Sequence, residues 1–497
     1  SDLECEDVPG VSDKETPLSG IDTELDLSLL NVNENEDESE DDKIPASQKS
    51  EGDDTEDNET YEPFQSPRGS LDLQEATQPS GRKYSHEEPH HENWPKHKKH
   101  VFILSNAGKP IYSRYGDESS LAGFVGVIQA IISFIQDDDD TIRSVKAGDV
   151  TIVFLVKGPI YLVCVAKTGE PPAKLEEQLL YMYSQIISIL TSRVNNIFSK
   201  RAQYDIRNLL VGTEKFLDSL MSWMDHDHSV IMNATHCLRL DSQTRNLIGS
   251  IMHSTKTQNL LYSILIARHQ LVNLVRPRKR ALHPSDLHLI LNFVNTCTAF
   301  RTSETWTPLC LPRFDDSGFL HAYVCFIATD ICLVKISTNP NDFYKMSECR
   351  NSIVQRFKSG ENSVFDILKH ALENQEYSPS EVGVSGLLHF VYKSLAISQI
   401  TCPRVEAPYT NRHERKRLFR MYEHVHQKAI EYQYKKYYHC SAKETVLAWI
   451  TGGFHLYATF GPLESISNVI AGCNTLLQWI KAEEAKTFVL DSPVFTQ

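Results

Sequence analysis

The sequence lacks the short motifs that mark most enzymes acting through covalent chemistry or through a bound phosphate. Its 497 residues contain no Walker-type phosphate loop, no Gly-x-Ser-x-Gly nucleophile elbow and no Cys-x-x-Cys pair. The eleven cysteines have no pairing rhythm, and Cys164, Cys325 and Cys332 lie in apolar runs, where a free thiol behaves as a small hydrophobe. We therefore expect no covalent catalysis, and reduced thiols typical of the cytosol.

Long hydrophobic segments are also missing. The longest apolar runs, Val150–Val156 and Leu121–Ile135, are too short or too interrupted to span a bilayer. No signal peptide opens the chain. These absences favour a cytoplasmic protein. The first residue is Ser1 rather than Met, which leaves open a fragment from which a targeting segment is missing.

Acidic and basic residues are divided unevenly along the chain. Residues 1–98 hold 28 Asp and Glu against 8 Lys and Arg, a net charge of −20. The remaining residues hold 37 acidic against 42 basic side chains, a net charge of +5. The first segment is also poor in large apolar residues, so burial cannot offset the entropy lost on ordering it. The composition predicts an acidic, disordered N-terminal tail at residues 1–98.

The tail has features of a regulatory segment. Ser39 and Thr55 are each followed by a run of acidic residues, and Ser66 precedes a proline. These three residues are candidate phosphorylation sites, where a phosphate would add further negative charge. We hypothesise that the tail folds back on basic patches of the body and restrains its activity.

The body after the tail predicts a regular order of elements. A hairpin is expected near Lys99, because two apolar runs flank the turn residues 105–110. A helix is expected from about Ser119, because apolar residues recur there at spacings of three and four. Three short strands follow, and a long helix runs to about Phe198. The predicted order is strand, strand, helix, three strands, helix.

That order of elements returns twice along the chain, without repeated residues. We therefore predict an α/β (α+β type) protein with three copies of one small domain, each an antiparallel five-stranded sheet flanked by helices. The predicted segments are the tail at 1–98, a first domain at 99–224, a helical connector at 225–258, a second domain at 259–360, a linker at 361–382 and a third domain at 383–497.

Two other local patterns could be interpreted as ligand sites. Gly123 and Gly126 lie within the first predicted amphipathic helix, where we interpret them as permitting close packing against a sheet or a partner. Histidines cluster at 86–91, 226–228 and 283–288. In the last cluster Asp286 and His288 lie just inside a helix start and point to different faces, so helix-start chemistry explains them better than zinc does. We predict no metal site and no cofactor.

Two basic runs and one tryptophan are candidates for contact with other molecules. The first run follows a strand and the second repeats along a predicted helix, and they comprise Arg276, Arg278, Lys279 and Arg280, and Arg412, Arg415, Lys416, Arg417 and Arg420. They are either solvated faces or patches that contact an anionic membrane. Nucleic acid is disfavoured, because no aromatic stacking motif accompanies them. Trp306 begins a short strand and is either a core residue or an interface anchor.

Three stretches of the body resemble a known family. They are Phe102-Ile-Leu-Ser-Asn-Ala-Gly-Lys-Pro-Ile-Tyr112, His283-Pro284 with Leu287-His-Leu-Ile-Leu291, and Trp306-Thr-Pro-Leu-Cys-Leu-Pro312 with Asp316-Ser-Gly-Phe319. They are similar to the SAND/Mon-one family of vacuolar and endosomal fusion proteins, over residues 99–490. The resemblance implies three longin domains, in agreement with the triplicated order of elements.

The family resemblance also implies a function and a set of partners. It implies one subunit of a guanine nucleotide exchange factor for the late-endosomal GTPase Rab-seven, acting in endosome maturation and in fusion with the lysosome or vacuole. The implied partners are the Ccz-one protein as an obligate heterodimer, a third scaffold subunit in animals, Rab-five as recruiter and phosphoinositide-containing membranes. Such a factor breaks no bond, which agrees with the absence of catalytic motifs.

The resemblance assigns candidate surfaces to particular residues. Asn106, Lys109, Tyr112 and Phe124 in the first domain are candidates for the partner and Rab-seven surfaces, and Trp306 for contact with Rab-five. The two basic runs become candidates for lipid contact, with the protein peripheral to endosomal and lysosomal membranes. An alternative function is a longin-type adaptor or tethering scaffold without exchange activity, and a zinc hydrolase is a third hypothesis.

Overall fold

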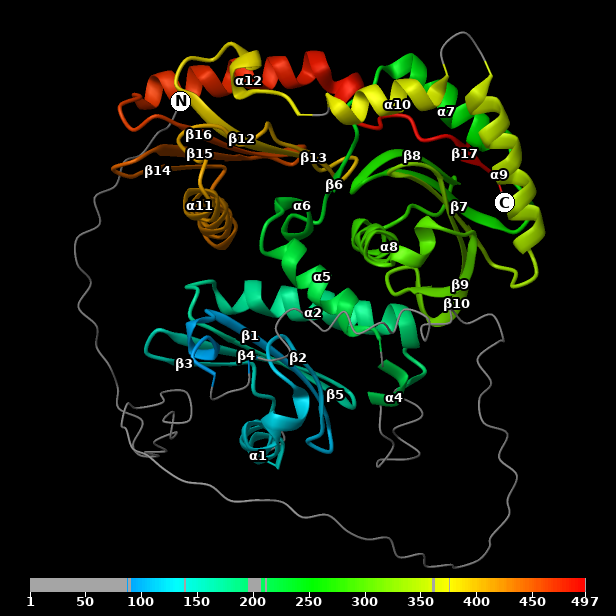
Figure 1. Cartoon of the computed structure of the whole chain (residues 1–497). Coiled ribbons are helices and arrows are strands. Elements are labelled where there is room, and N and C mark those ends of the chain that lie inside the picture. Colours follow the sequence, from blue (N-terminus) through cyan, green and yellow to red (C-terminus); the bar gives the residue numbers. More distant parts are fainter. Residues whose placement is uncertain are drawn as a thin grey trace, which may run out of the picture.

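The computed structural model describes residue 87 and residues 91–137, 140–194, 207–210, 212–359, 363–374 and 376–496. The phosphorylation candidates Ser39, Thr55 and Ser66 lie outside this part of the chain. Three α/β units follow one another along the described chain, each built on its own sheet (Figure 1). In Figure 1 the first unit is blue to green-blue, the second is green, and the third is orange to red.

The first unit has the predicted order of elements. Its strands are β1 (Lys99–Ser105), β2 (Pro110–Ser113), β3 (Ser144–Ala147), β4 (Val150–Lys157) and β5 (Ile160–Ala166), and its helices are α1 (Ala122–Asp137) and α2 (Pro172–Leu190). The strands form an antiparallel sheet in the order β2-β1-β5-β4-β3. The helix α2 ends short of the predicted Phe198, because Thr191 adopts a positive φ of 62° that breaks the helical backbone.

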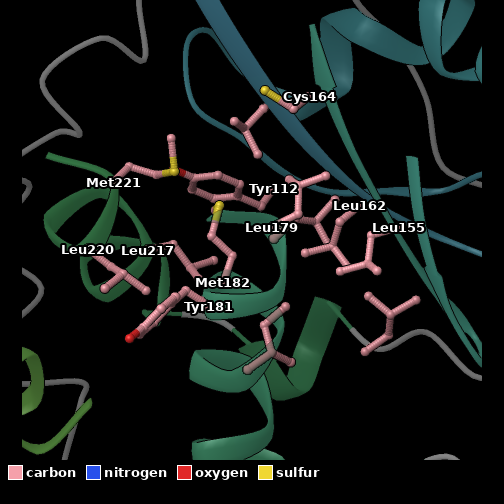
Figure 2. Close-up of a cluster of buried hydrophobic side chains, with 14 of the residues drawn as sticks. Tyr112, Leu155, Leu162, Cys164, Leu179, Tyr181, Met182, Leu217, Leu220 and Met221 are labelled. Atoms are coloured by element: carbon pink, nitrogen blue, oxygen red, sulfur yellow. The ribbon is translucent and has the colours of Figure 1, made fainter. Parts of the chain in front are cut away.

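Both faces of the first sheet are covered, and for this reason its central strands β1 and β5 are buried along their whole length. On one face α1 presents Val125, Ile128 and Ile132 of the apolar stripe that the sequence predicts, and Leu121 precedes the helix on the same face. On the other face α2 packs Leu175, Leu179, Met182 and Ile186 against the sheet (Figure 2). Each fully buried side chain of this kind contributes about 1.5–3 kcal/mol.

The second unit repeats this order with one addition. Its elements are β7 (Leu260–Ala267), β8 (Gln270–Pro277), α8 (Pro284–Thr296), β9 (Thr305–Leu311), β10 (Asp315–Ala328), β11 (Ile331–Ser337) and α9 (Phe343–Lys358). The predicted five strands are joined by β17 (Val494–Phe495), which comes from the end of the chain and pairs in parallel with β8. The sheet order is β17-β8-β7-β11-β10-β9, so β9 is an edge strand.

The third unit also gains a sixth strand from a distant segment. Its elements are β12 (Leu387–Ser394), β13 (Gln399–Thr401), α11 (Arg412–Glu431), β14 (Lys436–Cys440), β15 (Thr445–Ile450), β16 (Phe454–Phe460) and α12 (Ile466–Thr487). The short strand β6 (Thr235–His236) pairs in parallel with β13, giving the order β14-β15-β16-β12-β13-β6. Figure 1 places α12 on one face of this sheet and α11 on the face turned toward the first unit.

The segments between the units carry structure of their own. They contain α4 (Arg207–Leu210), α5 (Glu214–Met224), α6 (His228–Ile231), α7 (Ser242–Ser254) and α10 (Val364–Glu373), with a 3-10 turn at Pro379–Val382. Other 3-10 turns lie before the first unit, at Trp94–Lys96, and within the first and second units, at Glu118–Leu121 and Thr298–Arg301. The helix α10 lies within the segment predicted as a linker. Trp94, which the sequence places in the tail, is 7% exposed and packs 4.6 Å from the ring of His100.

The first and second units are joined by buried polar contacts between helices. The helices α2 and α5 pack against α8. At this junction the amide of Asn292 donates to Oε1 of Gln185 at 2.8 Å and to the carbonyl oxygen of Phe216 at 2.9 Å. Buried polar groups are costly unless they are paired, so this pairing specifies one orientation of the two units.

Candidate functional site

The outward face of α1 is apolar and exposed. Val127 is 42% exposed and Phe134 is 67% exposed, and both lie on the side of α1 away from its sheet together with Gly123, Gly126 and Ala130. A Cβ added at either glycine would meet no atom within 4 Å. A glycine inside a helix costs about 0.5–1 kcal/mol relative to alanine. Nothing in the described chain accounts for that cost, whereas a closely approaching partner would.

The equivalent helix of the second unit shows how such a face is covered within this chain. Ten consecutive residues of α8, Ser285–Val294, are buried. One side of α8 packs on its own sheet, and α2 of the first unit contributes with the connecting helix α5 to covering the other. The helix α1 stands at the same place in the order of elements. Among the described residues, no second unit packs on the outward face of α1 in this way.

The four residues predicted for this surface differ in accessibility. Asn106 and Lys109 lie in the turn between β1 and β2, and Lys109 is exposed. The turn is fastened to α1, because Nε2 of Gln129 donates to the carbonyl oxygen of Asn106 at 2.9 Å. Phe124 is half-buried on α1, with its ring 5.0 Å from that of Phe102.

Tyr112, the fourth residue, belongs to the interior of the first unit. Its side chain is 1% exposed, and its hydroxyl donates to Oδ1 of Asp218 on α5 at 2.6 Å. Figure 2 shows Tyr112 among side chains of α2 and α5, including Met182 and Met221. A partner cannot reach this ring in the structure. The exposed residues Val127 and Phe134 were missed, although Phe134 falls outside the inward spacing and so carried a signal.

Trp306 lies on the edge strand β9 and is half-buried. Its Nε1 donates to the carbonyl oxygen of Pro340 at 2.9 Å, and its ring is stacked on His321 at 5.7 Å between centroids. The ring therefore contributes to local packing and still presents surface at the sheet edge. The packing agrees with the reading of Trp306 as a core residue for the covered part of the ring, and the reading as an interface anchor stays a prediction.

The first basic run forms a loop after β8. Arg278, Lys279 and Arg280 are exposed, whereas Arg276 is half-buried. The backbone N–H groups of Arg276 and Arg278 donate to the carbonyl oxygens of Pro493 and Phe495 beside and on β17, which fixes the start of the loop. The guanidinium of Arg280 lies 5.2 Å from the centre of the Phe314 ring. Charges of both signs border this region, because Asp315 and Asp316 line the same shallow hollow as Lys279 and Arg280.

The second basic run divides between two faces of α11. The guanidinium of Arg417 pairs with Glu414 at 2.6 Å and with the buried carboxylate of Glu444, to which Nη2 donates at 2.7 Å. Tyr409 donates to the same carboxylate at 2.8 Å. Arg417 is thus held within the third unit. Nε of Arg415 also bonds inside the unit, to the carbonyl oxygen of Tyr409 at 3.4 Å.

The other members of this run face the first unit. Arg412, Lys416 and Arg420 are four residues apart on α11, and all three line a cleft of about 610 Å³ between α11 and the first unit. On the opposite wall lies a buried ionic network in which Lys99 contacts Glu170 at 2.8 Å and Asp225 at 3.2 Å, and Arg114 contacts Asp225 at 2.6 Å. Burial opposes ionisation of Asp225, but the two neighbouring cations prevail and lower its pKa to about 2.

Sequence comparison with known families identifies the three units. Residues 99–220, 258–355 and 386–484 match the first, second and third longin domains of FUZ, MON1 and HPS1. The chain is also 39% identical over 404 residues to vacuolar fusion protein MON1 homolog A of Gallus gallus, which covers 80% of this chain and 73% of that protein. The chain belongs to the MON1/SAND family.

Other members of the MON1/SAND family are similar over the same extent. The chain is 40% identical over 406 residues to protein SAND of Takifugu rubripes, covering 80% of this chain and 77% of that protein. It is 37% identical over 445 residues to the vacuolar fusion protein MON1 homolog of Arabidopsis thaliana, covering 84% and 73%. The family resemblance and the three longin domains predicted from the sequence are thereby confirmed, and with them a place among vacuolar fusion proteins.

Metal-ligand clusters and membrane-spanning helices were two further possibilities for the described part of this MON1-family chain. Within it, no group of three or more His, Cys, Asp or Glu side chains is placed to hold a metal ion. None of its helices is both long and apolar enough to cross a bilayer. In the predicted histidine cluster, Nδ1 of His283 caps α8 by accepting from the N–H of Ser285 at 3.1 Å, and His288 is buried with its pKa lowered to about 4 by burial.

Proposed function

We propose that this chain is one subunit of a heterodimeric guanine nucleotide exchange factor for the late-endosomal GTPase Rab-seven. It acts in the maturation of early to late endosomes and in their fusion with the lysosome or vacuole. Membership of the MON1/SAND family supports a role in vacuolar fusion. The observation that carries the proposal is the exposed apolar face of α1 with its two glycines, because it calls for a partner that packs as closely as one domain packs on another.

The partner on this face is a second longin-type chain, the Ccz-one protein. The chain itself supplies the precedent, since α8 is buried between its own sheet and the helices of a neighbouring longin domain. The glycines at 123 and 126 and Ala130 let a partner backbone approach, and Val127 and Phe134 supply apolar area. The exposed turn with Lys109 lies beside α1 and extends this surface toward the GTPase.

The mechanism is differential binding. The heterodimer holds nucleotide-free Rab-seven more tightly than the GDP-loaded form, and this difference in affinity lowers the barrier to GDP release. No bond is made or broken in the GTPase, so no nucleophile, general base or metal is required of this chain. Its contribution is a fixed shape that keeps a switch loop of the GTPase away from its nucleotide.

Recruitment to membranes uses other surfaces of the same chain. Rab-five is proposed to contact the exposed part of Trp306 at the edge strand β9. The exposed loop residues Arg278, Lys279 and Arg280 are proposed to meet the anionic surface of phosphoinositide-containing membranes, with the protein peripheral to endosomes and lysosomes. A third scaffold subunit completes the assembly in animals.

The proposal is tested by following release of a fluorescent GDP analogue from Rab-seven. The purified heterodimer is expected to accelerate release strongly. This chain alone is expected to do little, because the part of the GTPase-binding surface that the partner supplies is then missing. An adaptor or tethering scaffold would bind Rab proteins without changing the release rate. Release at the intrinsic rate in the presence of a stable heterodimer would therefore favour that alternative.

A further inference from the structure

The third longin domain leaves one edge of its sheet uncovered. Among the described residues β14 pairs only with β15, and it ends the sheet order β14-β15-β16-β12-β13-β6. Two other sheet edges of this molecule are covered by short strands from distant parts of the chain, because β17 pairs with β8 and β6 pairs with β13. The chain therefore uses strand addition twice, and β14 offers an edge for a third addition.

The outward-facing backbone groups of β14 belong to a defined set of residues. The N–H of Ile450 donates to the carbonyl oxygen of Lys435 at 2.8 Å, and the N–H of Ser441 donates to the carbonyl oxygen of Glu444 at 2.9 Å. Hydrogen-bonded and non-bonded pairs alternate in an antiparallel ladder, so between these two points every second residue of β14 turns its N–H and C=O away from β15. These residues are Lys436, Tyr438 and Cys440.

Exposed apolar and aromatic side chains adjoin this edge. Ile430 is 49% exposed, Tyr432 is 52% exposed and Tyr434 is 45% exposed, at the end of α11 and in the turn that leads into β14. The ring of Tyr434 is stacked with that of Tyr432 at 5.6 Å and with that of Tyr437 at 5.9 Å between centroids. Lysines at an edge are enough to discourage unwanted pairing, but exposed aromatic rings are not part of that protection. The surface therefore suits an occupant with apolar side chains.

The charge beside β14 is positive. Residues 428–440 hold three lysines, Lys428, Lys435 and Lys436, against one carboxylate, Glu431. Within the described chain none of these lysines takes part in an ion pair. Lys436 lies on the face of β14 turned toward α12, with its Nζ 4.1 Å from the centre of the Trp449 ring, and the other two flank the aromatic rings. An occupant of this edge should therefore carry acidic side chains as well as apolar ones.

One segment of the same chain has the sequence pattern of such an occupant. Residues 21–29 alternate strictly between two sets, with Ile21, Thr23, Leu25, Leu27 and Leu29 at the odd positions and Asp22, Glu24, Asp26 and Ser28 at the even positions. An alternation with period 2 places the two sets on opposite faces of an extended segment. One face is then apolar and the other carries three carboxylates, which complement the rings and the lysines beside β14. These residues lie outside the described part of the chain.

The segment is long enough in sequence from the body to reach this edge. Lys96 and Lys98, near the start of the described chain, line the same cleft as Arg412 and Arg420 of α11. The 20 residues of α11 span about 30 Å and lead into β14. A chain as long as residues 30–90 would cover about 40 Å even as a random coil, and more when extended. The segment at residues 21–29 is therefore within reach of β14.

We propose that residues 21–29 add to the third sheet as a strand along the free edge of β14, and so cover this edge as β6 and β17 cover two others. The outward backbone groups of β14 then gain hydrogen-bond partners. The leucines pack on the rings of Tyr434 and Tyr437, and the carboxylates face Lys436. This contact lies on a different domain from the α1 face and does not depend on the proposed exchange activity.

The test is hydrogen exchange of the full chain, resolved to single amides by fragmentation in the mass spectrometer. In the wild type the amides of Lys436, Tyr438 and Cys440 are expected to be protected, although β15 does not bond them. The variant Leu25→Asp/Leu27→Asp is expected to raise their exchange rates about tenfold or more, while the amides bonded to β15 keep their rates. A tail attracted by charge alone would gain attraction from the two added carboxylates and would protect no alternating set of amides.

The matched control is Leu71→Asp/Leu73→Asp, which makes the same substitutions elsewhere in the tail and is expected to leave exchange of β14 as in the wild type. A fluorescein-labelled peptide of residues 20–31 is the second probe. It is expected to bind the Leu25→Asp/Leu27→Asp variant about tenfold more tightly than the wild type, whose edge is already occupied. Fast exchange of the three outward amides in the wild type, equal exchange in the two variants, or equal peptide binding by wild type and variant would overturn the inference.

Discussion

Arg417 and Lys416 are neighbours on α11, yet their side chains have different roles. Arg417 is fixed between Glu414 and the buried carboxylate of Glu444, whereas Lys416 projects into the cleft among other cations. A charge reversal across the whole basic run would therefore mix two effects. It would remove exposed charge, and it would also leave a buried carboxylate without its partner.

Replacement of Arg417 by alanine is expected to destabilise the third longin domain. Glu444 is 1% exposed, so removing the guanidinium leaves a buried charge whose remaining partner is Tyr409. The expected loss is about 3 kcal/mol, visible as a lower melting temperature and as faster proteolysis of this domain. Arg415→Ala is the control, with a change within about 0.5 kcal/mol. Equal melting temperatures for the two variants would contradict the assigned role of Arg417.

Glu423 predicts a dependence of stability on pH. Burial raises its folded-state pKa from 4.5 to about 8, so the folded chain holds a proton that the unfolded chain releases between these values. The stability from this group is fully present below pH 4.5 and is lost as pH rises through 8, by on the order of 5 kcal/mol. Glu423→Gln removes this dependence, and its melting temperature is expected to exceed that of wild type at pH 8.5 but not at pH 4.5. Parallel pH profiles of melting temperature for Glu423→Gln and wild type would contradict a buried, protonated Glu423.

At the scale of elements, α1 differs from its counterparts in having one covered face and one exposed apolar face. The double variant Gly126→Leu/Phe134→Glu fills the space left by the glycine and places a charge on the same face. The chain itself is expected to fold normally, because neither position touches the core. Association with the Ccz-one protein is expected to be lost, as measured by co-purification and by analytical ultracentrifugation.

The control for this variant is Leu463→Glu, at an apolar residue that is 98% exposed in the third domain. It is expected to leave the heterodimer intact. Persistence of the heterodimer in the α1 variant would place the partner on another surface.

Substitutions of Trp306 on the edge strand β9 test the proposed contact with Rab-five. Trp306→Ala is expected to abolish activation that depends on Rab-five, while exchange in solution stays unchanged, because the ring lies far along the chain from α1 and at the edge of another sheet. Trp306→Phe retains the stacking on His321 but loses the hydrogen bond to Pro340, and is expected to retain most of the activation. A large fall in melting temperature for the alanine variant alone would assign Trp306 to packing instead.

Much of this element order could be predicted from local patterns, and the exceptions have physical causes. The apolar spacing of α1 and the turn chemistry at residues 105–110 are local signals, and the structure confirms the elements that they predicted. The strands β6 and β17 are two residues long and exist only because a distant sheet edge accepts them, so no local pattern could reveal them. The pairing of Arg417 with Glu444 and the burial of Tyr112 likewise arise from contacts distant in sequence.

At the scale of the whole molecule, three longin domains are joined by buried contacts and leave distinct surfaces exposed. The α1 face, the edge at Trp306 and the basic loop after β8 lie on different elements, so the proposed contacts with a partner, a GTPase and a membrane do not compete for one surface. A factor of this kind works only if its affinity for the GTPase depends on the bound nucleotide, because equal affinity for both states shifts no equilibrium.

The most direct test of the account is therefore the affinity of the heterodimer for Rab-seven with and without nucleotide. By thermodynamic linkage, the factor by which GDP weakens binding of the heterodimer equals the factor by which the heterodimer weakens binding of GDP. Surface-based binding measurements are expected to give an affinity about a hundredfold higher for nucleotide-free Rab-seven than for the GDP-loaded form. Equal affinities for the two forms would contradict the account and leave an adaptor without exchange activity.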